Sequence, residues 1–239
     1  MSATIPFPVP AKRAAASPAA RAQRFGLLLV ALLATILVQG ASTPGDVQRV
    51  VVSALVGATL VLALRVGEAR RSIVLGGLVL AFALACATIV QAITGHVGVL
   101  STAICDALLV MFAPPAVALG VLRSLRRHGR VRIDAVLGVL CLYLLFGMFC
   151  AFGWAILNEL NPPFFANHGA ANGSNFQYFS FVTLATVGYG DFTARTPLGH
   201  TLSVLEALVG QIYLVTVVSV FVTNIGRNRA VNNRAVNNG

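Results

Sequence analysis

Six apolar runs, each long enough to cross a lipid bilayer as a helix, constrain the fold of this chain more than any other feature. A helix needs about 20 apolar residues to span a hydrocarbon core of ~30 Å. Hydrophobic residues make up 57% of the chain and charged residues 10%, where soluble domains carry about a quarter charged residues. The runs cover residues 25–41, 50–66, 72–93, 97–122, 133–157 and 199–225. The sequence therefore predicts an all-α integral membrane protein with six transmembrane helices.

A seventh apolar run, residues 176–185, is too short to cross a bilayer and ends at the sequence Thr-Val-Gly-Tyr-Gly-Asp, residues 186–191. Non-helical backbone at membrane depth is tolerated where it is buried in protein or lines water. The short run is therefore predicted to be a re-entrant helix between the fifth and sixth spans, followed by a loop that lines an aqueous path.

The glycines of this loop suggest what it does. Gly188 and Gly190 alternate with larger residues, and glycine adopts the left-handed backbone conformation at little steric cost. A backbone that alternates in this way can turn successive carbonyl oxygens to one side, where they replace the hydration shell of a cation. The Thr186 hydroxyl can add one more oxygen. An ordinary glycine-rich turn is the alternative, and five specified residues between two apolar spans favour the carbonyl-lined path.

The distribution of basic residues predicts the topology. Fifteen of the 17 lysines and arginines lie in segments that six spans place on one side of the membrane, and Arg49 and Arg195 lie on the other. Basic residues favour the cytoplasmic side, so both termini are predicted to be cytoplasmic. The net charge of +10 is explained by this asymmetry and by attraction to anionic inner-leaflet lipid, without a nucleic-acid partner.

The first span allows a second interpretation. A basic leader, an apolar core and the small residues 40–42 also resemble a secretory signal peptide. Cleavage would leave five spans without inverting the others, so the charge distribution does not decide between the two. The long leader and the lack of a sharp cleavage site favour retention.

From residue 133 onward, over about 95 residues, the chain resembles the pore domain of the potassium channel superfamily. The run 178–185 before the loop and the run 206–213 in the last span are similar to its bacterial ion-channel family. The resemblance implies a homotetramer, and a ring of four loops requires one because the chain contains a single loop. It also implies that the carbonyls of Thr186, Val187, Gly188 and Tyr189, with the Thr186 hydroxyl, hold dehydrated potassium ions as the permeant ligand.

In the channels that the chain resembles, these ion-binding residues form the selectivity filter. The resemblance assigns supporting roles around this filter. Gly190 and Asp191 complete it, and Tyr178 and Phe179 are expected to pack around Tyr189. Two positions depart from the pattern. Val182 stands where some bacterial relatives have an acid that pairs with the aspartate after the filter, and Ala185 replaces a common threonine.

Gly210 lies where the family places a hinge in the inner helix, and glycine in a helix costs ~1 kcal/mol relative to alanine and permits bending. Close approach of a neighbouring helix explains the residue equally well. Gln211, Leu214 and Val218 follow at helical spacing and are candidates to line the cavity.

Two acids lie at membrane depth, where a charge must face protein or water. Glu206 in the last span is a candidate modulatory acid, expected behind the pore helix within reach of Ser180 or Thr183. Asp106 in the fourth span has no lysine or arginine deep in the membrane to pair with. A solvated crevice or protonation explains it better than a dedicated ion site.

The first four spans stand where six-helix channels carry a voltage sensor, which needs about 3–4 basic residues in its fourth helix. Residues 97–122 contain none and instead hold Pro114 and Pro115, which are expected to kink or break the helix. Voltage dependence is therefore predicted to be weak or absent. The predicted organisation is a cytoplasmic tail (1–24), a four-helix membrane domain (25–122), a basic linker (123–132), a pore domain (133–226) and a cytoplasmic C-terminal tail (227–239) with no regular structure.

The sequence thus predicts a potassium-selective channel of the plasma or inner membrane, without enzymatic activity and without a cofactor. The alternative is a nonselective cation channel, because a filter sequence alone does not ensure the filter geometry. A transporter would show mirrored halves with interrupted helices, and an enzyme would show clustered catalytic side chains.

Overall fold

The structure, a computed structural model, describes residues 18–41, 45–67, 99–128, 133–167 and 171–237, together with isolated positions between 75 and 90. The helices in this part of the chain are α1 (Pro18–Ala41), α2 (Asp46–Val66), α4 (Val99–His128), α5 (Ile133–Leu160), α6 (Gly173–Leu184) and α7 (Pro197–Asn237). Strands are absent from the described residues apart from one antiparallel bridge between Phe165 and Ala194. The predicted all-α class is confirmed for these residues, and most of the predicted third span, 72–93, lies outside them.

Four of the described helices contain segments long and apolar enough to cross a membrane: Ala22–Ala41, Val47–Val66, Ala135–Leu160 and Pro197–Val217. The apolar part of α4, Ile104–Leu119, is shorter. The chain is therefore a helical membrane protein.

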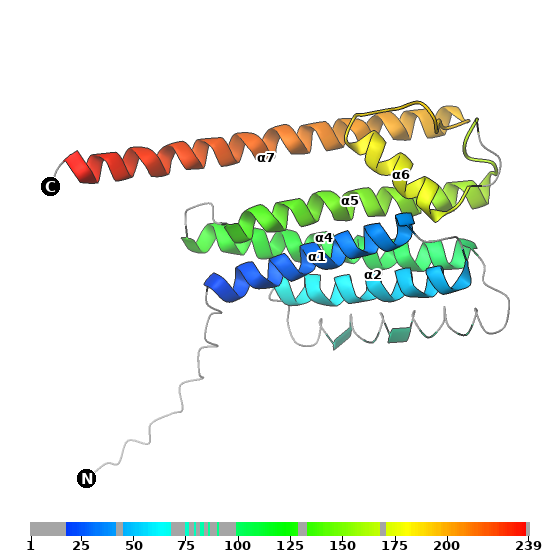
Figure 1. Cartoon of the computed structure of the whole chain (residues 1–239), viewed down its shortest axis with the longest axis horizontal. Helices are drawn as coiled ribbons and strands as arrows, with labels where there is room; N and C mark the ends of the chain where they lie inside the picture. Colours follow the sequence, from blue (N-terminus) through cyan, green and yellow to red (C-terminus); the bar gives the residue numbers. More distant parts are fainter. Residues whose placement is uncertain are drawn as a thin grey trace, which may run out of the picture.

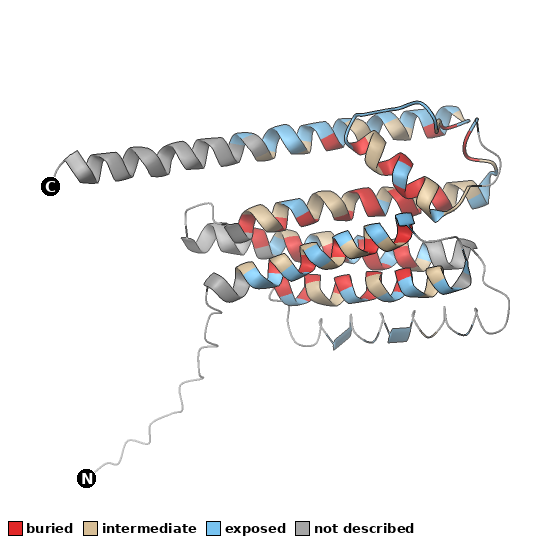
Figure 2. Ribbon diagram, in the orientation of Figure 1, coloured by how far each residue is buried: buried red, intermediate tan, exposed pale blue. Residues whose placement is uncertain are grey.

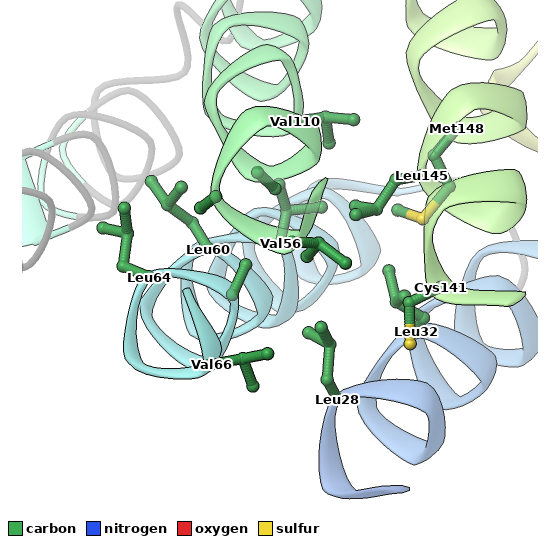
Figure 3. Packing of buried hydrophobic residues seen from close by; sticks show 14 of the residues in the cluster. Leu28, Leu32, Val56, Leu60, Leu64, Val66, Val110, Cys141, Leu145 and Met148 are labelled. Atoms are coloured by element: carbon green, nitrogen blue, oxygen red, sulfur yellow. The ribbon is translucent and has the colours of Figure 1, made fainter. Parts of the chain in front are cut away.

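Helices α1, α2, α4 and α5 pack side by side into a bundle, as Figure 1 shows. Their buried faces turn toward one another (Figure 2). Leu28 and Leu32 of α1 meet Val56 of α2 and Leu145 and Met148 of α5 in the core (Figure 3). Lipid tails are as apolar as leucine, so this bundle is held by close packing rather than by the exclusion of water.

Helix α7 lies apart from α1, α2 and α4 and contacts α5 and α6 among the described helices (Figure 1). Much of its membrane segment is therefore exposed in a single chain (Figure 2). The exposed large apolar side chains of α7 are Leu198, Val204, Leu205, Leu208, Val209, Ile212, Leu214 and Val215. This apolar face has no partner within the described chain.

The proline pair was predicted to kink or break the helix, and the break does not occur. Helix α4 runs without interruption from Val99 to His128 with Pro114 and Pro115 inside it. Each proline removes one helical amide donor, and neighbouring helices in a membrane bundle support a helix around such a gap. Here α2 and α5 both pack on α4.

The predicted lack of regular structure at the C-terminus is also wrong, because α7 continues as helix through Asn237. Adding a residue to an existing helix needs no new nucleus and is therefore far easier than starting one. Residues 227–237 contain no proline or glycine to stop the continuation.

Candidate functional site

The site is built on α6, a short helix that lies between α5 and α7 at the end of the molecule away from the C-terminus (Figure 1). Its first turn is closed by reciprocal hydrogen bonds. The Asn172 side chain accepts from the Asn175 amide at 3.1 Å, and the Asn175 side chain accepts from the Asn172 amide at 3.0 Å. Such a capping box satisfies amides that a helix start leaves without partners. The helix predicted for residues 176–185 is therefore present, with its start three residues earlier.

The loop that follows α6, residues 186–191, has an alternating backbone. Thr186, Gly188 and Gly190 have φ angles of 56°, 54° and 80°, and the residues between them do not adopt positive φ. The predicted left-handed conformation of both glycines is confirmed. Thr186 is a further left-handed residue that the sequence did not indicate, and strain of ~1–3 kcal/mol at a non-glycine residue is characteristic of functional sites.

Hydrogen bonds tie the start of this loop to the end of α6. The Thr186 amide donates to the Thr183 carbonyl at 2.9 Å, and the Val187 amide donates to the Val182 carbonyl at 2.9 Å. The side chains beyond this point are exposed in a single chain, with Tyr189 71% and Val187 51% exposed. The loop is thus anchored at its α6 end, and in one chain its residues face open space.

Tyr178 interacts with two residues of the 186–191 loop, Tyr189 and Asp191. Its ring stacks on Tyr189 with centroids 6.4 Å apart and an interplanar angle of 8°. Partial desolvation, the hydrogen bond to Asp191 and the charge of that carboxylate raise the pKa of the Tyr178 hydroxyl. Asp191 also accepts from the Phe192 amide at 3.0 Å. Val182 has no carboxyl group that could pair with Asp191. The Tyr178 hydroxyl interacts with Asp191 instead.

Phe179 lies on the other side of α6, within an aromatic cluster that joins α5 to the loops around the site. Its ring is 5.6 Å from Trp154, 5.8 Å from Phe164 and 5.3 Å from Phe165, edge to face in each case. This geometry is favourable for aromatic pairs. Phe179 therefore supports α6 from behind, whereas Tyr178 contacts Tyr189 directly.

Glu206 of α7 is buried behind α6, 3% exposed. It accepts from the Ser180 hydroxyl at 2.5 Å and from the Trp154 indole at 2.9 Å. Ser180 was one of the two partners expected from the sequence, and Trp154 was missed. The carboxylate therefore joins α5, α6 and α7 at one point.

Gly210 lies one turn further along α7, where the helix passes the end of α6. A Cβ at this position would collide with the carbonyl oxygen of Leu184 and with a side-chain carbon of the same residue. Glycine is thus needed here for close approach, one of the two explanations that the sequence left open. Gln211 and Leu214 are exposed in a single chain, and the Val218 side chain lies outside the described ones.

The segment after the loop is attached to the segment that follows α5 by contacts that the sequence did not reveal. The Arg195 amide donates to the Phe164 carbonyl at 2.8 Å, and the Ala166 amide donates to the Thr193 carbonyl at 2.9 Å. The His200 ring lies 2.6 Å from the Ala194 carbonyl oxygen. These bonds hold the loop at its far end, so both of its ends are anchored.

Comparison with known proteins supports the reading of this region. Residues 138–227 match the family described as "Ion channel". A segment of 48 residues is 46% identical to the "Probable potassium channel protein 2" of Methanocaldococcus jannaschii, over 19% of this chain and 14% of that protein. The chain thus matches a small part of the relative's length. No solved structure matches.

The match spans α5 from its second turn, all of α6, the 186–191 loop and most of α7. The two matches support the resemblance inferred from the sequence, and they indicate a channel rather than an enzyme. Residues 138–227 are therefore similar to the ion channel family, and a shorter segment is similar to a probable potassium channel.

Proposed function

We propose that this protein is a potassium-selective channel that conducts dehydrated potassium ions passively. The observation that carries the proposal is the alternation of left-handed residues at Thr186, Gly188 and Gly190 within the sequence Thr-Val-Gly-Tyr-Gly. Potassium filters have this sequence and present rings of backbone carbonyls to the ion. The 46% identity to a probable potassium channel over 48 residues points the same way.

The ligands in this proposal are the carbonyls of Thr186, Val187, Gly188 and Tyr189, with the Thr186 hydroxyl as the innermost oxygen. Several sites in single file bind each ion well enough to replace its hydration shell, and repulsion between neighbouring ions lets them leave. Gly190 allows the backbone to turn out of the filter at a φ of 80°. Potassium is the permeant substrate, and the proposal involves no cofactor.

The membrane arrangement follows from combining the helices with the charges. We place six spans in the bilayer of a plasma or inner membrane, the third of them at residues 72–93, and treat α6 as a re-entrant pore helix. The start of α1 and the end of α7 lie at the same end of the molecule (Figure 1). Most basic residues lie in segments that six spans assign to that end, so both termini are cytoplasmic in this proposal. Leu28 and Leu32 of α1 belong to the core, which supports a retained first span.

Four chains are required to close the pore. The exposed apolar face of α7 and the exposed 186–191 loop are the surfaces that neighbouring subunits and lipid would cover. A ring of four loops around a fourfold axis gives each ion site four equivalent carbonyls. The functional unit is therefore a homotetramer.

In this proposal α1 braces the pore helix, and the first four spans do not sense voltage. The Gln39 side chain of α1 donates to the Gly173 carbonyl at 3.1 Å, and the Gln177 side chain of α6 donates to the Ile36 carbonyl at 2.9 Å. The predicted fourth span, residues 97–122, contains no lysine or arginine. The gating stimulus is therefore not a displacement of charges in this helix.

The reversal potential in planar bilayers under a potassium/sodium gradient tests the proposal. The wild type should reverse near the potassium equilibrium potential. Gly188→Ala should lose this selectivity, because Gly188 has a φ of 54° that an alanine adopts with strain. Gly26→Ala is the matched control, since a Cβ at Gly26 meets nothing within 4 Å. Reversal near zero with intact conductance in the wild type would instead identify a nonselective cation channel.

A further inference from the structure

A cavity of about 160 Å³, lined by both polar and apolar residues, lies where α1 ends and where α2 and α6 begin. It is large enough for several water molecules. Its wall combines side chains of five helices, among them Gln39, Gln48, Asp106 and Glu159. None of residues 186–191 lines it, so it is separate from the proposed filter. In the proposed topology the cavity lies at the extracellular end of the bundle.

Asp106 is the buried acid of this cavity, with 5% of its surface exposed. Its Oδ2 atom accepts from the Ser53 hydroxyl at 3.0 Å. Its Oδ1 atom is fully buried and has no hydrogen-bond partner among the described residues. A carboxylate removed from water without such partners is costly, and a cation held in the adjacent cavity would remove that cost.

The rest of the wall supplies oxygen atoms. The Gln39 side-chain nitrogen donates to the Gly173 carbonyl at 3.1 Å, and the Gln48 side-chain nitrogen donates to the Gln39 carbonyl at 2.9 Å. Because each amide has its nitrogen engaged, each has its oxygen left to serve as a ligand. Glu159 adds a second carboxylate, and Arg49 is the one basic residue among the described residues that line the wall. Among the described residues of the wall, acidic side chains outnumber basic ones, and neither cysteine nor histidine occurs.

Carboxylate and amide oxygens without sulfur or imidazole are the ligands of hard cations. We propose that this cavity binds a hard divalent cation such as Ca²⁺, with the Asp106 carboxylate as its principal ligand and with Gln39, Gln48 and Glu159 providing further oxygens. Two carboxylates beside an arginine give a weak site, with a dissociation constant on the order of 10⁻⁴–10⁻³ M, as in extracellular calcium modules. The sequence favoured a solvated crevice or protonation for Asp106 over a dedicated ion site, and the oxygen ligands in the wall of this cavity are what point to a cation.

Gln39 connects this site to the pore helix, since its side chain holds the Gly173 carbonyl in the first turn of α6. A cation bound to the oxygen of the same amide would hold α1, α4 and α6 together at the extracellular end. External divalent ions would then alter the open probability of the channel, a consequence that rests on the proposed function. Binding itself does not rest on it.

Titration of the purified full-length protein with Mn²⁺ in saturating KCl, followed by the electron paramagnetic resonance signal of free Mn²⁺, tests the site. The wild type should bind Mn²⁺ in competition with Ca²⁺. Asp106→Asn should weaken binding by about tenfold or more, the loss seen when even outer-shell groups of metal sites are removed. Ser53→Ala, which keeps the carboxylate, should still bind.

Unchanged affinity in Asp106→Asn, or no binding by the wild type, would overturn the proposal. If Asp106→Asn does not fold, Glu159→Gln takes its place, because Glu159 is exposed. Its affinity should then fall measurably, and an unchanged affinity would overturn the proposal. Gly188→Ala should keep the Mn²⁺ site while it loses potassium selectivity, so failure of either proposal is distinguishable from failure of the other.

Discussion

Ser180 donates its hydroxyl to the carboxylate of Glu206 across the interface between α6 and α7, with 2.5 Å between the two oxygens. The same Ser180 hydroxyl lies 2.8 Å from the Gly147 carbonyl of α5. Because Trp154 of α5 donates to the second oxygen of Glu206, the three helices that surround the proposed filter share one hydrogen-bonded cluster. A displacement of α7 would therefore act directly on the helix that carries the filter.

Glu206→Gln should change the open probability or the conductance of the channel. The substitution keeps the size of the side chain but removes the charge that strengthens both hydrogen bonds, and charge-assisted bonds are roughly twice as strong as neutral ones. Single-channel recordings at several pH values are the measurement. Trp154→Phe, which keeps an aromatic ring and removes one donor, should shift the same property in the same direction. Unchanged currents in Glu206→Gln at every pH would show that the acid has a structural role alone.

Gly210→Ala should destabilise the protein, because the added methyl group would collide with the Leu184 carbonyl. Overpacking of a close contact costs typically ~1–3 kcal/mol, and here the obstacle is backbone that cannot rotate away. Thermal unfolding of the purified protein, compared with Gly26→Ala, measures the effect. A variant that unfolds like the wild type and differs only in open probability would favour the hinge over the close contact.

Tyr178→Phe should make the filter less stable while it keeps the ring stacked on Tyr189. The substitution removes the hydroxyl that bonds to Asp191 and leaves the aromatic surface in place. The expected result is a faster decline of current during sustained opening. Because the pKa of the Tyr178 hydroxyl is raised above its usual value of 10.0, the wild type keeps this donor throughout neutral pH. A decay identical to that of the wild type would show that the bond has no part in filter stability.

The opening of the channel should depend weakly on voltage. Each elementary charge that crosses the whole membrane field contributes ~2.3 kcal/mol per 100 mV, and the fourth span has no basic residue to move. A conductance–voltage curve recorded in symmetric potassium measures this dependence. A steep curve equivalent to several gating charges would refute it and would place the sensor elsewhere in the chain.

Features encoded locally in the sequence were predicted well. Apolar runs of membrane length located α1, α2, α5 and α7, and the glycines at 188 and 190 indicated the backbone conformation that they adopt. The steric freedom of glycine is a property of the residue itself, which is why the sequence reveals it. The helical continuation of α7 through Asn237 was missed because a polar repeat carries no apolar periodicity to indicate a helix.

Contacts between distant segments could not be predicted in this way. Trp154 and Glu206 are 52 residues apart, and Gln39 and Gly173 are 134 residues apart. Nothing in either local pattern specifies which of many side chains will meet across a helix interface. The cavity beside Asp106 is lined by residues of five helices, so the polar groups in its wall come together only in the folded chain.

The most direct measurement of the central claim is the position of bound ions in the assembled tetramer. Crystals grown in rubidium in place of potassium would locate the ions by anomalous scattering. The account predicts several peaks in single file on the fourfold axis, at the level of the carbonyls of Thr186, Val187, Gly188 and Tyr189. Clear density for the loop without rubidium between these carbonyls, or one hydrated ion in a wide pore, would contradict it.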